Sequence, residues 1–248
     1  MISFNNIGYM GRLGNQMFQY AALKGIAIHR GYWYSLPSNS SLFECFNLKT
    51  TLPNNNHKSI HCDMFEFDQD FFNTCPDDVD ISGYFQSNKY FQHIEDEIRQ
   101  DFTFKELIVD SCVEYKNKNF SDKQIISLHI RRTDYLTDKN FELLSMQYYK
   151  DALKLLPQLP VLIFSDDIKW CKETFVGERF TFSPFTNAFN DLCLMSKCDY
   201  HIIANSSFSW WGSWLARSKQ TIAPKKWFCG EFSNWNTKDL YLPKWILL

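Results

Sequence analysis

From residue 124 onward, the chain alternates between short apolar runs and segments of helical length. The apolar runs are rich in β-branched residues and have the composition of β-strands, at Gln124–Ile130, Val161–Ser165, Tyr200–Ala204 and Thr221–Pro224. Strand–helix–strand units at this spacing predict an α/β fold, in which a parallel, doubly wound sheet forms a Rossmann-like lobe.

Capping residues mark the helices of this lobe. Ser145 and Asn187 each precede a helical segment, and Ser206 or Ser207 precedes another that runs through Ser218. Short polar side chains at these positions can accept hydrogen bonds from the free N–H groups of a first helical turn. We therefore expect helices to begin at these residues.

The N-terminal part has a similar but shorter pattern. We expect a strand at Ile2–Asn5, a helix at Asn15–Arg30 with Gly31 as its C′ residue, and a strand at Tyr32–Ser35. Residues 36–80 show no regular spacing of apolar residues, so we favour a solvated loop region there.

The end of that irregular region is strongly acidic. Residues 61–80 contain seven Asp or Glu and no Lys or Arg, and Pro53 and Asn54–Asn56 precede them. The pairs Asp68-Gln69-Asp70 and Asp78-Val79-Asp80 have the DxD form that can hold a divalent metal on a nucleotide-sugar. So short a pattern arises easily by chance in an acidic stretch, which again favours a loop.

Composition excludes several classes of protein. The 248 residues carry a net charge of −2, which does not fit a nucleic-acid binder that depends on counterion release. No run of about 18 apolar residues is present, so we expect no membrane span. The start of the chain lacks the charged and apolar regions of a signal peptide, and we predict a cytoplasmic protein.

The eight cysteines are dispersed and form no CxxC pair. Without a signal peptide, they are expected to be reduced thiols. His61-Cys62 and the pair Cys193/Cys198 are the crowded places, and neither has the spacing of zinc ligands. We therefore predict no metal site.

Polar residues follow the predicted strand that ends at Ile130. They form the run His129-Ile130-Arg131-Arg132-Thr133-Asp134. Two arginines at the end of a buried strand cost desolvation energy unless they meet anions. A diphosphate is a suitable partner, because a guanidinium group can bind its oxygens through two hydrogen bonds at once. Asp134 could hold one arginine in place. The alternative is an ion-pair cluster that ties the sheet to a loop, but the position at a strand end favours an anion site.

Two other strand ends also carry polar residues. Ser165-Asp166-Asp167 could bind a ribose hydroxyl or cap the next helix. Asn205-Ser206-Ser207 offers hydroxyls and free N–H groups to a phosphate, or a simple N-cap. Trp210, Trp211 and Trp214 are expected to pack the following helix on the sheet, although one of them could stack on a sugar.

The loop Gly8–Gln16 precedes the first predicted helix. Its glycines do not have the GxGxxG spacing of a dinucleotide site, but they allow a ligand to approach the backbone closely. Arg12, Asn15 and Gln16 place polar side chains at the start of the helix. These side chains could bind a nucleotide or cap the helix.

Together these motifs resemble a known family. Gly11-Arg12-Leu13-Gly14-Asn15-Gln16-Met17-Phe18-Gln19-Tyr20-Ala21, Gly83-Tyr84-Phe85-Gln86-Ser87 and Asn205-Ser206-Ser207-Phe208-Ser209-Trp210-Trp211-Gly212 resemble motifs of glycosyltransferase family 11. The run His129–Asp134 resembles the HxRRxD motif that α-1,2-, α-1,6- and protein O-fucosyltransferases share. The resemblance spans nearly the whole chain with the motifs in order.

The resemblance implies a GT-B-like fold, with two Rossmann-like lobes facing each other across a cleft. It implies an acceptor-side lobe over residues 1–120, a lobe that binds GDP-fucose over 121–225, and a segment 226–248 that crosses back to the first lobe. The implied reaction moves L-fucose from GDP-β-L-fucose to the 2-hydroxyl of a galactose-terminated glycan, with inversion and without a metal or other cofactor.

The resemblance also implies roles for residues of the donor-binding lobe. Arg131 would hold the β-phosphate and neutralise the leaving group, with Arg132 and His129 supporting the nucleotide. Ser206 and Ser207 would donate hydrogen bonds to diphosphate oxygens. Residues that complete the implied donor site are Asp134, Asp166, Asn205 and Phe208.

Asp191 would accept hydrogen bonds from guanine, because related α-1,6 enzymes carry a carboxylate at this offset before Ser207. The alternative for Asp191 is a solvated position on a helix surface. From the other lobe, Asn15 with Gly14 and Arg12 would face the fucose and the attacking hydroxyl.

The chemistry fits these roles, because fixed arginines and helix N–H groups interact more strongly with GDP as its charge grows during bond breaking. Asn15 is not basic enough to be a general base. A carboxylate within residues 36–80 and a water relay are the open candidates, and a leaving group this good can make a strong base unnecessary.

Other functions are possible from the same residues. One is a metal-dependent sugar transferase that uses a DxD pair with another nucleotide-sugar, and another is a fucosyltransferase of different linkage. A non-catalytic sugar-binding module is a third alternative, but it would have no use for adjacent arginines beside a hydroxyl-rich helix start.

Overall fold

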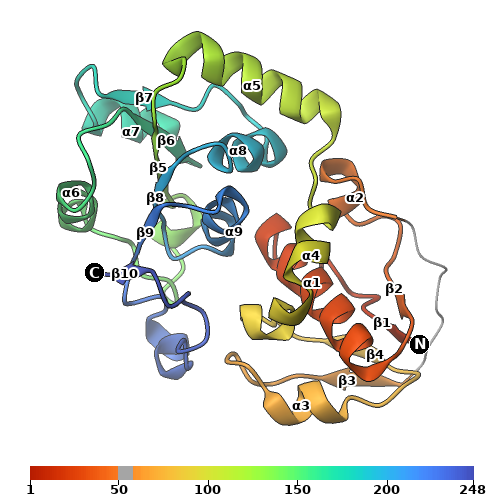
Figure 1. The fold of residues 1–248 in the computed structure, drawn as a ribbon. Helices are drawn as coiled ribbons and strands as arrows, with labels where there is room; N and C mark the ends of the chain where they lie inside the picture. The colour runs from red at the N-terminus through yellow and green to blue at the C-terminus, as the bar shows by residue number, and fades with distance from the viewer. Residues whose placement is uncertain (50–57) are drawn as a thin grey trace. The chain divides into compact units, whose positions relative to one another are not determined.

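The part of the chain that the structure describes forms two compact units. The structure is a computed structural model and describes all residues except 50–57. Unit 1 contains residues 1–105 and 236–242, and unit 2 contains residues 106–235 and 243–248. Each unit has a parallel β-sheet with helices beside it (Figure 1). The predicted α/β class is therefore confirmed.

The sheet of unit 1 has the strand order β2-β1-β4-β3, and its strand pairs are parallel. The strand, helix and strand that we predicted for the N-terminal part are present, and their ends differ from the predicted ends by at most two residues. In chain order they are β1 (Ile2–Ser3), α1 (Leu13–Arg30), β2 (Tyr34–Ser35), α2 (Leu42–Cys45), β3 (Ser59–His61), α3 (Gln69–Thr74), β4 (Asp80–Ser82), η1 (Asn88–Tyr90), η2 (Gln92–Ile94) and α4 (Glu95–Asp101).

Helix α1 ends as predicted and packs unusually closely against its neighbour. Gly31 adopts the left-handed conformation at φ 71°, and its N–H donates to the carbonyl oxygen of Ile28. A Cβ atom at Gly25 would lie only 1.9 Å from the carbonyl oxygen of Tyr90. The small residue thus allows α1 to lie directly on the backbone of η1.

Replacing Gly25 by alanine should destabilise unit 1. In an open helix this change would be stabilising, because alanine has the higher helix propensity. Here the added methyl group forces the η1 backbone to move, and we expect the free energy of unfolding to fall by about 2–3 kcal/mol. Urea unfolding measures this effect, and an unchanged or higher midpoint would contradict the close approach.

The prediction of a solvated loop over residues 36–80 is wrong for the described part of that range. It contains α2, β3, α3 and β4. These elements are three to six residues long, which is too short for a period to be recognised. Pro53 and Asn54–Asn56 lie outside the described residues.

The sheet of unit 2 has the order β10-β9-β8-β5-β6-β7 and is parallel throughout. All strands predicted after residue 120 are present, together with β7 and β10, which we did not predict. In chain order the elements are α5 (Glu106–Phe120), β5 (Ile126–Ile130), η3 (Asp134–Leu136), α6 (Met146–Lys154), β6 (Val161–Ser165), α7 (Ile168–Thr174), β7 (Phe180–Phe182), α8 (Ala188–Met195), β8 (Tyr200–Ile202), α9 (Ser207–Ala216), β9 (Gln220–Ala223), η4 (Gly230–Asn234) and β10 (Ile246–Leu247).

Two predicted caps are confirmed in unit 2. The side chain of Ser145 accepts a hydrogen bond from the backbone N–H of Tyr148 at the start of α6. The side chain of Asn187 accepts one from Asn190 at the start of α8. The short polar residues therefore fixed these two helix starts as expected.

Helix α5 belongs to unit 2, whereas we placed it in the N-terminal lobe. The thiol of Cys112 donates to the carbonyl oxygen of Asn190 on α8, and the hydroxyl of Tyr115 donates to that of Phe182 on β7. Conversely, residues 236–242 belong to unit 1. There the buried carboxylate of Asp239 accepts hydrogen bonds from Lys89 Nζ and from the backbone N–H of Phe67.

The strand orders show where each sheet can bind a ligand. In unit 1, the chain leaves β1 toward β2 on one side and later occupies β4 and β3 on the other. In unit 2, β6 and β7 lie on one side of β5, and β8, β9 and β10 lie on the other. Ligands of open α/β sheets bind beyond the carboxyl ends of strands at such a reversal. The reversals lie between β1 and β4 and between β5 and β8.

The three tryptophans of α9 form part of the core of unit 2. Trp210, Trp211 and Trp214 are buried, and the ring centroids of Trp210 and Trp211 are 5.0 Å apart. They pack the helix on the sheet, as we expected, and are not available to stack on a sugar.

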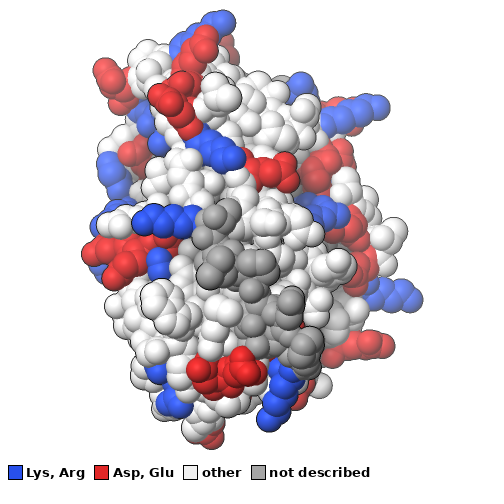
Figure 2. All heavy atoms as spheres, turned by 90° about the vertical axis from the view of Figure 1, so that its right-hand side faces the viewer, with Lys and Arg blue, Asp and Glu red and all other residues white. Residues whose placement is uncertain are grey.

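The surface and the helices are those of an ordinary mixed-charge protein. Acidic and basic side chains are interspersed on the face drawn in Figure 2. All eight cysteines are free thiols, and seven of them are buried. Among the described helices, none has the length and apolar character needed to cross a membrane.

Candidate active site

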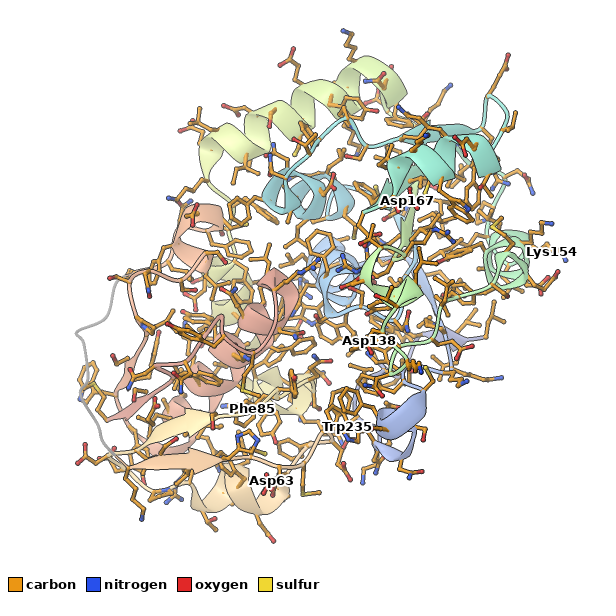
Figure 3. All side chains as sticks on the ribbon, turned by 180° about the vertical axis from the view of Figure 1, so that it is seen from behind. Asp63, Phe85, Asp138, Lys154, Asp167 and Trp235 are labelled. Atoms are coloured by element: carbon orange, nitrogen blue, oxygen red, sulfur yellow. The ribbon has the colours of Figure 1, made fainter. Side chains whose placement is uncertain are left out.

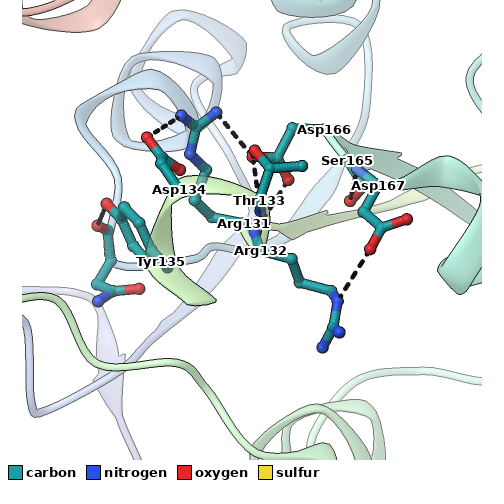
Figure 4. A network of polar contacts seen from close by, with 9 residues as sticks. Arg131, Arg132, Thr133, Asp134, Tyr135, Ser165, Asp166 and Asp167 are labelled. Carbon is teal, nitrogen blue, oxygen red and sulfur yellow. Dashed lines mark hydrogen bonds and ion pairs between the residues drawn. The ribbon is translucent and has the colours of Figure 1, made fainter. Parts of the chain in front are cut away.

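Arg131 lies just beyond the carboxyl end of β5, and carboxylates hold its guanidinium from two sides. Nη2 donates to Asp134 Oδ2 at 2.5 Å, and Nη1 pairs with Asp166 Oδ2 at 3.1 Å (Figure 4). The guanidinium carbon is 5.7 Å from the ring centroid of Tyr135. A guanidinium has five N–H donors, so this cradle fixes its direction and leaves donors for an anion.

Asp166 holds the whole start of this loop. Its carboxylate accepts hydrogen bonds from the backbone N–H groups of Arg132 and Thr133, at 2.9 and 3.2 Å, and from the Thr133 hydroxyl at 2.6 Å. We placed Asp166 in the donor site, with a ribose contact or a helix cap as the alternatives, and the donor-site role stays a prediction. Its observed contacts fix the position of Arg131 instead.

The family resemblance implies that Arg131 neutralises a leaving diphosphate. Replacing Asp166 by asparagine should then lower the kcat of sugar transfer about 10- to 100-fold, because a displaced Arg131 no longer matches the charge that develops on the diphosphate. Steady-state kinetics measures this effect, with the same substitution at the exposed Asp122 as the control. A kcat for Asp166→Asn equal to that of the Asp122→Asn variant would contradict the positioning role.

Arg132 is fixed in a different direction. Its Nε donates to Asp167 Oδ2 at 3.2 Å, and its guanidinium carbon lies 3.9 Å from the ring centroid of Trp170. Asp167 also accepts a hydrogen bond from the backbone N–H of Trp170, which confirms the capping alternative for Asp167. We predicted no role for Trp170, because its contact with Arg132 becomes visible only when the fold brings α7 near the residues that follow β5.

The start of α9 lies beyond β8, on the other side of the same reversal. Ser206 occupies the N-cap position, but its side chain makes no capping hydrogen bond. Capping therefore does not account for its hydroxyl. Ser206, Ser207 and Phe208 are partly exposed. The first turn of a helix offers N–H groups and a positive dipole end to an anion, so the arrangement suits a diphosphate.

Asn205 is fastened to neighbouring loops, and the donor-binding role that we expected for it stays a prediction. It is buried, and its Nδ2 donates to the carbonyl oxygens of Glu142 and Trp227, each at 2.9 Å. The backbone carbonyl oxygen of Asn205 accepts a hydrogen bond from the hydroxyl of Tyr135 at 2.8 Å. Asn205 thus ties the loops after β5, β8 and β9 together.

His129 is the last-but-one residue of β5 and is 5% exposed. Burial, and then the charge of Arg131, lower its pKa to about 3. Its ring centroid lies 5.6 Å from that of Phe208. The imidazole is therefore neutral near pH 7 and can offer one donor and one acceptor to a ligand.

Asp191 lies in the first turn of α8 beside Ser183, whose hydroxyl donates to Asp191 Oδ1. Burial raises the pKa of Asp191 to about 6, against the opposing effect of the Ser183 hydrogen bond. Asp191 is partly exposed, and its carboxyl is partly desolvated. A carboxylate short of hydrogen-bond donors suits a ligand that brings N–H groups.

In unit 1, the predicted residues lie at the reversal between β1 and β4. Gly14 is buried inside α1, Arg12 is exposed at its N-cap, and Asn15 is partly exposed in its first turn. Asn15 Oδ1 accepts a hydrogen bond from Gln86 Nε2 at 2.9 Å, so the first and second family motifs touch. Gln86 had no predicted role, although its place within the second family motif was a usable signal.

The DxD pairs have structural places. Asp68 caps α3 by accepting from the backbone N–H of Phe71, while Asp80 is buried and accepts from Ser3 Oγ and the Asn5 N–H. The residues outside 50–57 contain no cluster of three His, Cys, Asp or Glu side chains that could hold a metal ion.

Comparison with known families gives one match over the full length. The family model described as "Glycosyl transferase family 11" matches residues 1–248. The agreement includes all the motifs that lie at the two sheet reversals.

Similar proteins come from bacteria and animals. The "O-antigen biosynthesis glycosyltransferase WbnK" of Escherichia coli is 29% identical over 96% of this chain and 98% of its own length. The "Alpha-1,2-colitosyltransferase" of Escherichia coli is 31% identical over 95% of this chain and 96% of its own. The "Galactoside alpha-(1,2)-fucosyltransferase 2" of Pongo pygmaeus is 23% identical over 85% and 68%.

Solved structures agree in fold. The crystal structure of the fucosyltransferase NodZ from Bradyrhizobium superposes with a TM-score of 0.56, covering 86% of this chain and 92% of that one. At 12% identity, the likeness concerns the fold alone.

Proposed function

Because this chain belongs to glycosyl transferase family 11, we propose that it is an inverting α-1,2-fucosyltransferase. It moves L-fucose from GDP-β-L-fucose to the 2-hydroxyl of a galactose in a glycan, without a metal. The observation that carries the proposal is the Arg131 guanidinium, oriented by Asp134 and Asp166 at the sheet reversal that also contains the start of α9.

The proposed roles follow the charge in the reaction. The galactose hydroxyl attacks the anomeric carbon from the face opposite the diphosphate and gives its proton to water. The bond to the β-phosphate oxygen breaks with its electron pair on GDP. Arg131 and the N–H groups of the α9 start then meet an extra negative charge, so they stabilise the transition state more than the ground state. Ser206 and Ser207 add hydroxyl donors to the same oxygens.

We assign guanine recognition to Asp191. An ionised carboxylate can accept hydrogen bonds from N1–H and the 2-amino group of guanine at once, which a uracil base cannot supply. The desolvated position of Asp191 supports this role, because a buried carboxylate gains most from such donors. His129 is expected to contact the nucleotide as a neutral ring.

A colitosyltransferase is the second candidate. The relative named "Alpha-1,2-colitosyltransferase" is 31% identical over nearly the whole of both chains. Colitose is L-fucose without its 3-hydroxyl group, so a donor with the same nucleotide and the same linkage would use the same arginines. The two functions differ only in the surroundings of the sugar 3-position.

The test begins with calorimetric titration of GDP and UDP in the presence of EDTA. We expect GDP to bind and UDP to bind much more weakly. Transfer to galactosides is then compared for GDP-fucose and GDP-colitose, with release of GDP as the readout. Equal binding of the two nucleotides, or binding that EDTA abolishes, would contradict the proposal and favour a metal-dependent enzyme.

We also propose that the enzyme acts in the cytoplasm. The eight free cysteines support this location, because an oxidising compartment would expose them to disulfide formation.

A further inference from the structure

Two costly features are adjacent in the loop that follows β4. Phe85, labelled in Figure 3, is a buried non-glycine residue at φ 52°, in the left-handed region. Gln86 comes next and is 6% exposed, and its Oε1 has no hydrogen-bond partner among the described residues. Strained backbone and an unsatisfied buried amide both reduce stability. Such costs point to a function for the side chain that they hold.

The side chain of Gln86 is aimed at one residue. Its Nε2 donates to Asn15 Oδ1 at 2.9 Å. On the other side of Asn15, a Cβ atom at Gly11 would lie 2.0 Å from Asn15 Nδ2. The amide of Asn15 is therefore held between Gln86 and the backbone of Gly11.

The two loops that carry these residues are themselves fastened to each other. Gln19 Nε2, inside α1, donates to the carbonyl oxygen of Met10 at 3.1 Å and to that of Gly83 at 3.4 Å. Gln19 is fully buried. The loop after β1 and the loop after β4 thus have a fixed spacing, and Gln86 can hold Asn15 in one orientation.

We propose that Gln86 is a positioning residue that sets which end of the Asn15 amide faces the substrate. The oxygen of Asn15 accepts from Gln86, so its amino group lies at the other end of the amide, beside Gly11 in the loop that follows β1. Asn15 then acts on the sugar as a hydrogen-bond donor. This inference rests on the proposed function, since it assumes that the Asn15 side chain contacts the sugar.

The amide orientation is a matter of hydrogen bonding, because the two ends of an asparagine amide have nearly the same shape. Glutamate at position 86 would be almost isosteric but could only accept. It would therefore turn the Asn15 amide round, so that the oxygen faced the substrate. Methionine at position 86 would remove the hydrogen bond without imposing either orientation.

The test is a double-mutant cycle in kcat. Gln86→Glu should lower kcat by about 10- to 100-fold, and Gln86→Met should lower it less. In an Asn15→Ala background neither change should lower kcat further, because no amide remains to be oriented. Asn15→Asp, which still accepts from Gln86 but cannot donate, should resemble Gln86→Glu. Gln92→Glu, the same substitution at an exposed site of unit 1, is the control.

A merely structural role would give a different pattern. It would lower kcat in the Asn15→Ala background by the same factor as in the wild type, and it would lower the melting temperature in parallel. That result, or wild-type kcat for Gln86→Glu, would overturn the proposal. Affinity for GDP should be unchanged in every variant.

The orientation can also be judged without turnover. The side-chain amide signal of Asn15, identified by its loss in Asn15→Ala, should shift in the NMR spectrum of Gln86→Glu and not in that of Gln92→Glu. If the wild type transfers no sugar from either donor, the proposed function fails, while the spectrum still decides whether Gln86 orients Asn15. An unchanged signal in Gln86→Glu would refute the orientation itself.

Discussion

Arg131→Ala is expected to lower kcat by about 10²–10³-fold, the usual loss when an oriented donor to developing charge is removed. The guanidinium is the charge that Asp134 and Asp166 hold in place. Without it the departing diphosphate is left with the N–H groups of α9. Single-turnover kinetics with GDP-fucose measures the effect on the chemical step itself.

A second variant separates charge from geometry. Arg131→Lys retains the positive charge but not the planar fork, so it should recover only part of the lost rate. Lysine also remains a cationic partner for the carboxylates of Asp134 and Asp166. Arg131→Ala leaves these carboxylates without that partner, so it should lower the stability of the fold somewhat. Turnover by Arg131→Ala at the wild-type rate would refute the role of Arg131.

Asp191→Ala is expected to weaken GDP binding on the order of 10²-fold, since two charge-assisted hydrogen bonds are lost. Binding of ADP, which lacks the guanine donors, should hardly change. Inosine diphosphate lacks only the 2-amino group, so the wild type should prefer GDP to it and the variant should not. Equal weakening of all three nucleotides would show that Asp191 does not contact the base.

Asp191 should also make GDP binding depend on pH. In the role proposed for Asp191, guanine donates to the ionised carboxylate, and the pKa of Asp191 in the unliganded protein is about 6. Affinity should therefore fall as the pH drops below about 6, beyond any change that the phosphate causes. Asp191→Asn shows the phosphate effect alone, and titrations at pH 5 to 8, values chosen around that pKa, should give diverging curves for the two proteins.

The same pKa predicts an effect on stability of opposite sign. The carboxyl has a higher pKa in the folded protein than its ordinary value of 3.8, so ionisation destabilises the fold. The free energy of unfolding should fall as the pH rises from about 4 to about 6 and then level off. Asp191→Asn should lack this fall.

The sequence was sufficient for those parts of the fold in which local signals agree with one another. Ser145, Asn187 and Gly31 mark helix ends by their own chemistry, and the structure confirms each of them. Strands β5, β6, β8 and β9 of unit 2 are largely buried apolar runs, and they too were predicted, whereas the more exposed β7 and β10 were not. Of the short strands that begin within residues 36–80, β4 depends on pairing with β1 and β3 on pairing with β4, and such pairing leaves no local signal in segments so short.

The candidate site, too, could be predicted only in part from local sequence signals. Arg131 could be selected from its place at a strand end, but the sequence could not show what Asp166 touches. Its partners are backbone N–H groups 33 and 34 residues away, and backbone donors leave no trace in side-chain identity. Asn205 was assigned to the ligand by its motif, and the sequence could not show that its amide nitrogen donates to the carbonyl oxygens of Glu142 and Trp227.

The return of residues 236–242 to unit 1 restricts how this chain can be cut or recombined. A fragment that ends at Lys105 would lack Asp239, and with it the partner of Lys89 and Phe67. A deletion from Asn236 onward would damage both units, because it also removes the edge strand β10 from unit 2. Exchange of one unit between relatives therefore requires matched junctions near residues 105, 235 and 242, and a single crossover yields two incomplete folds.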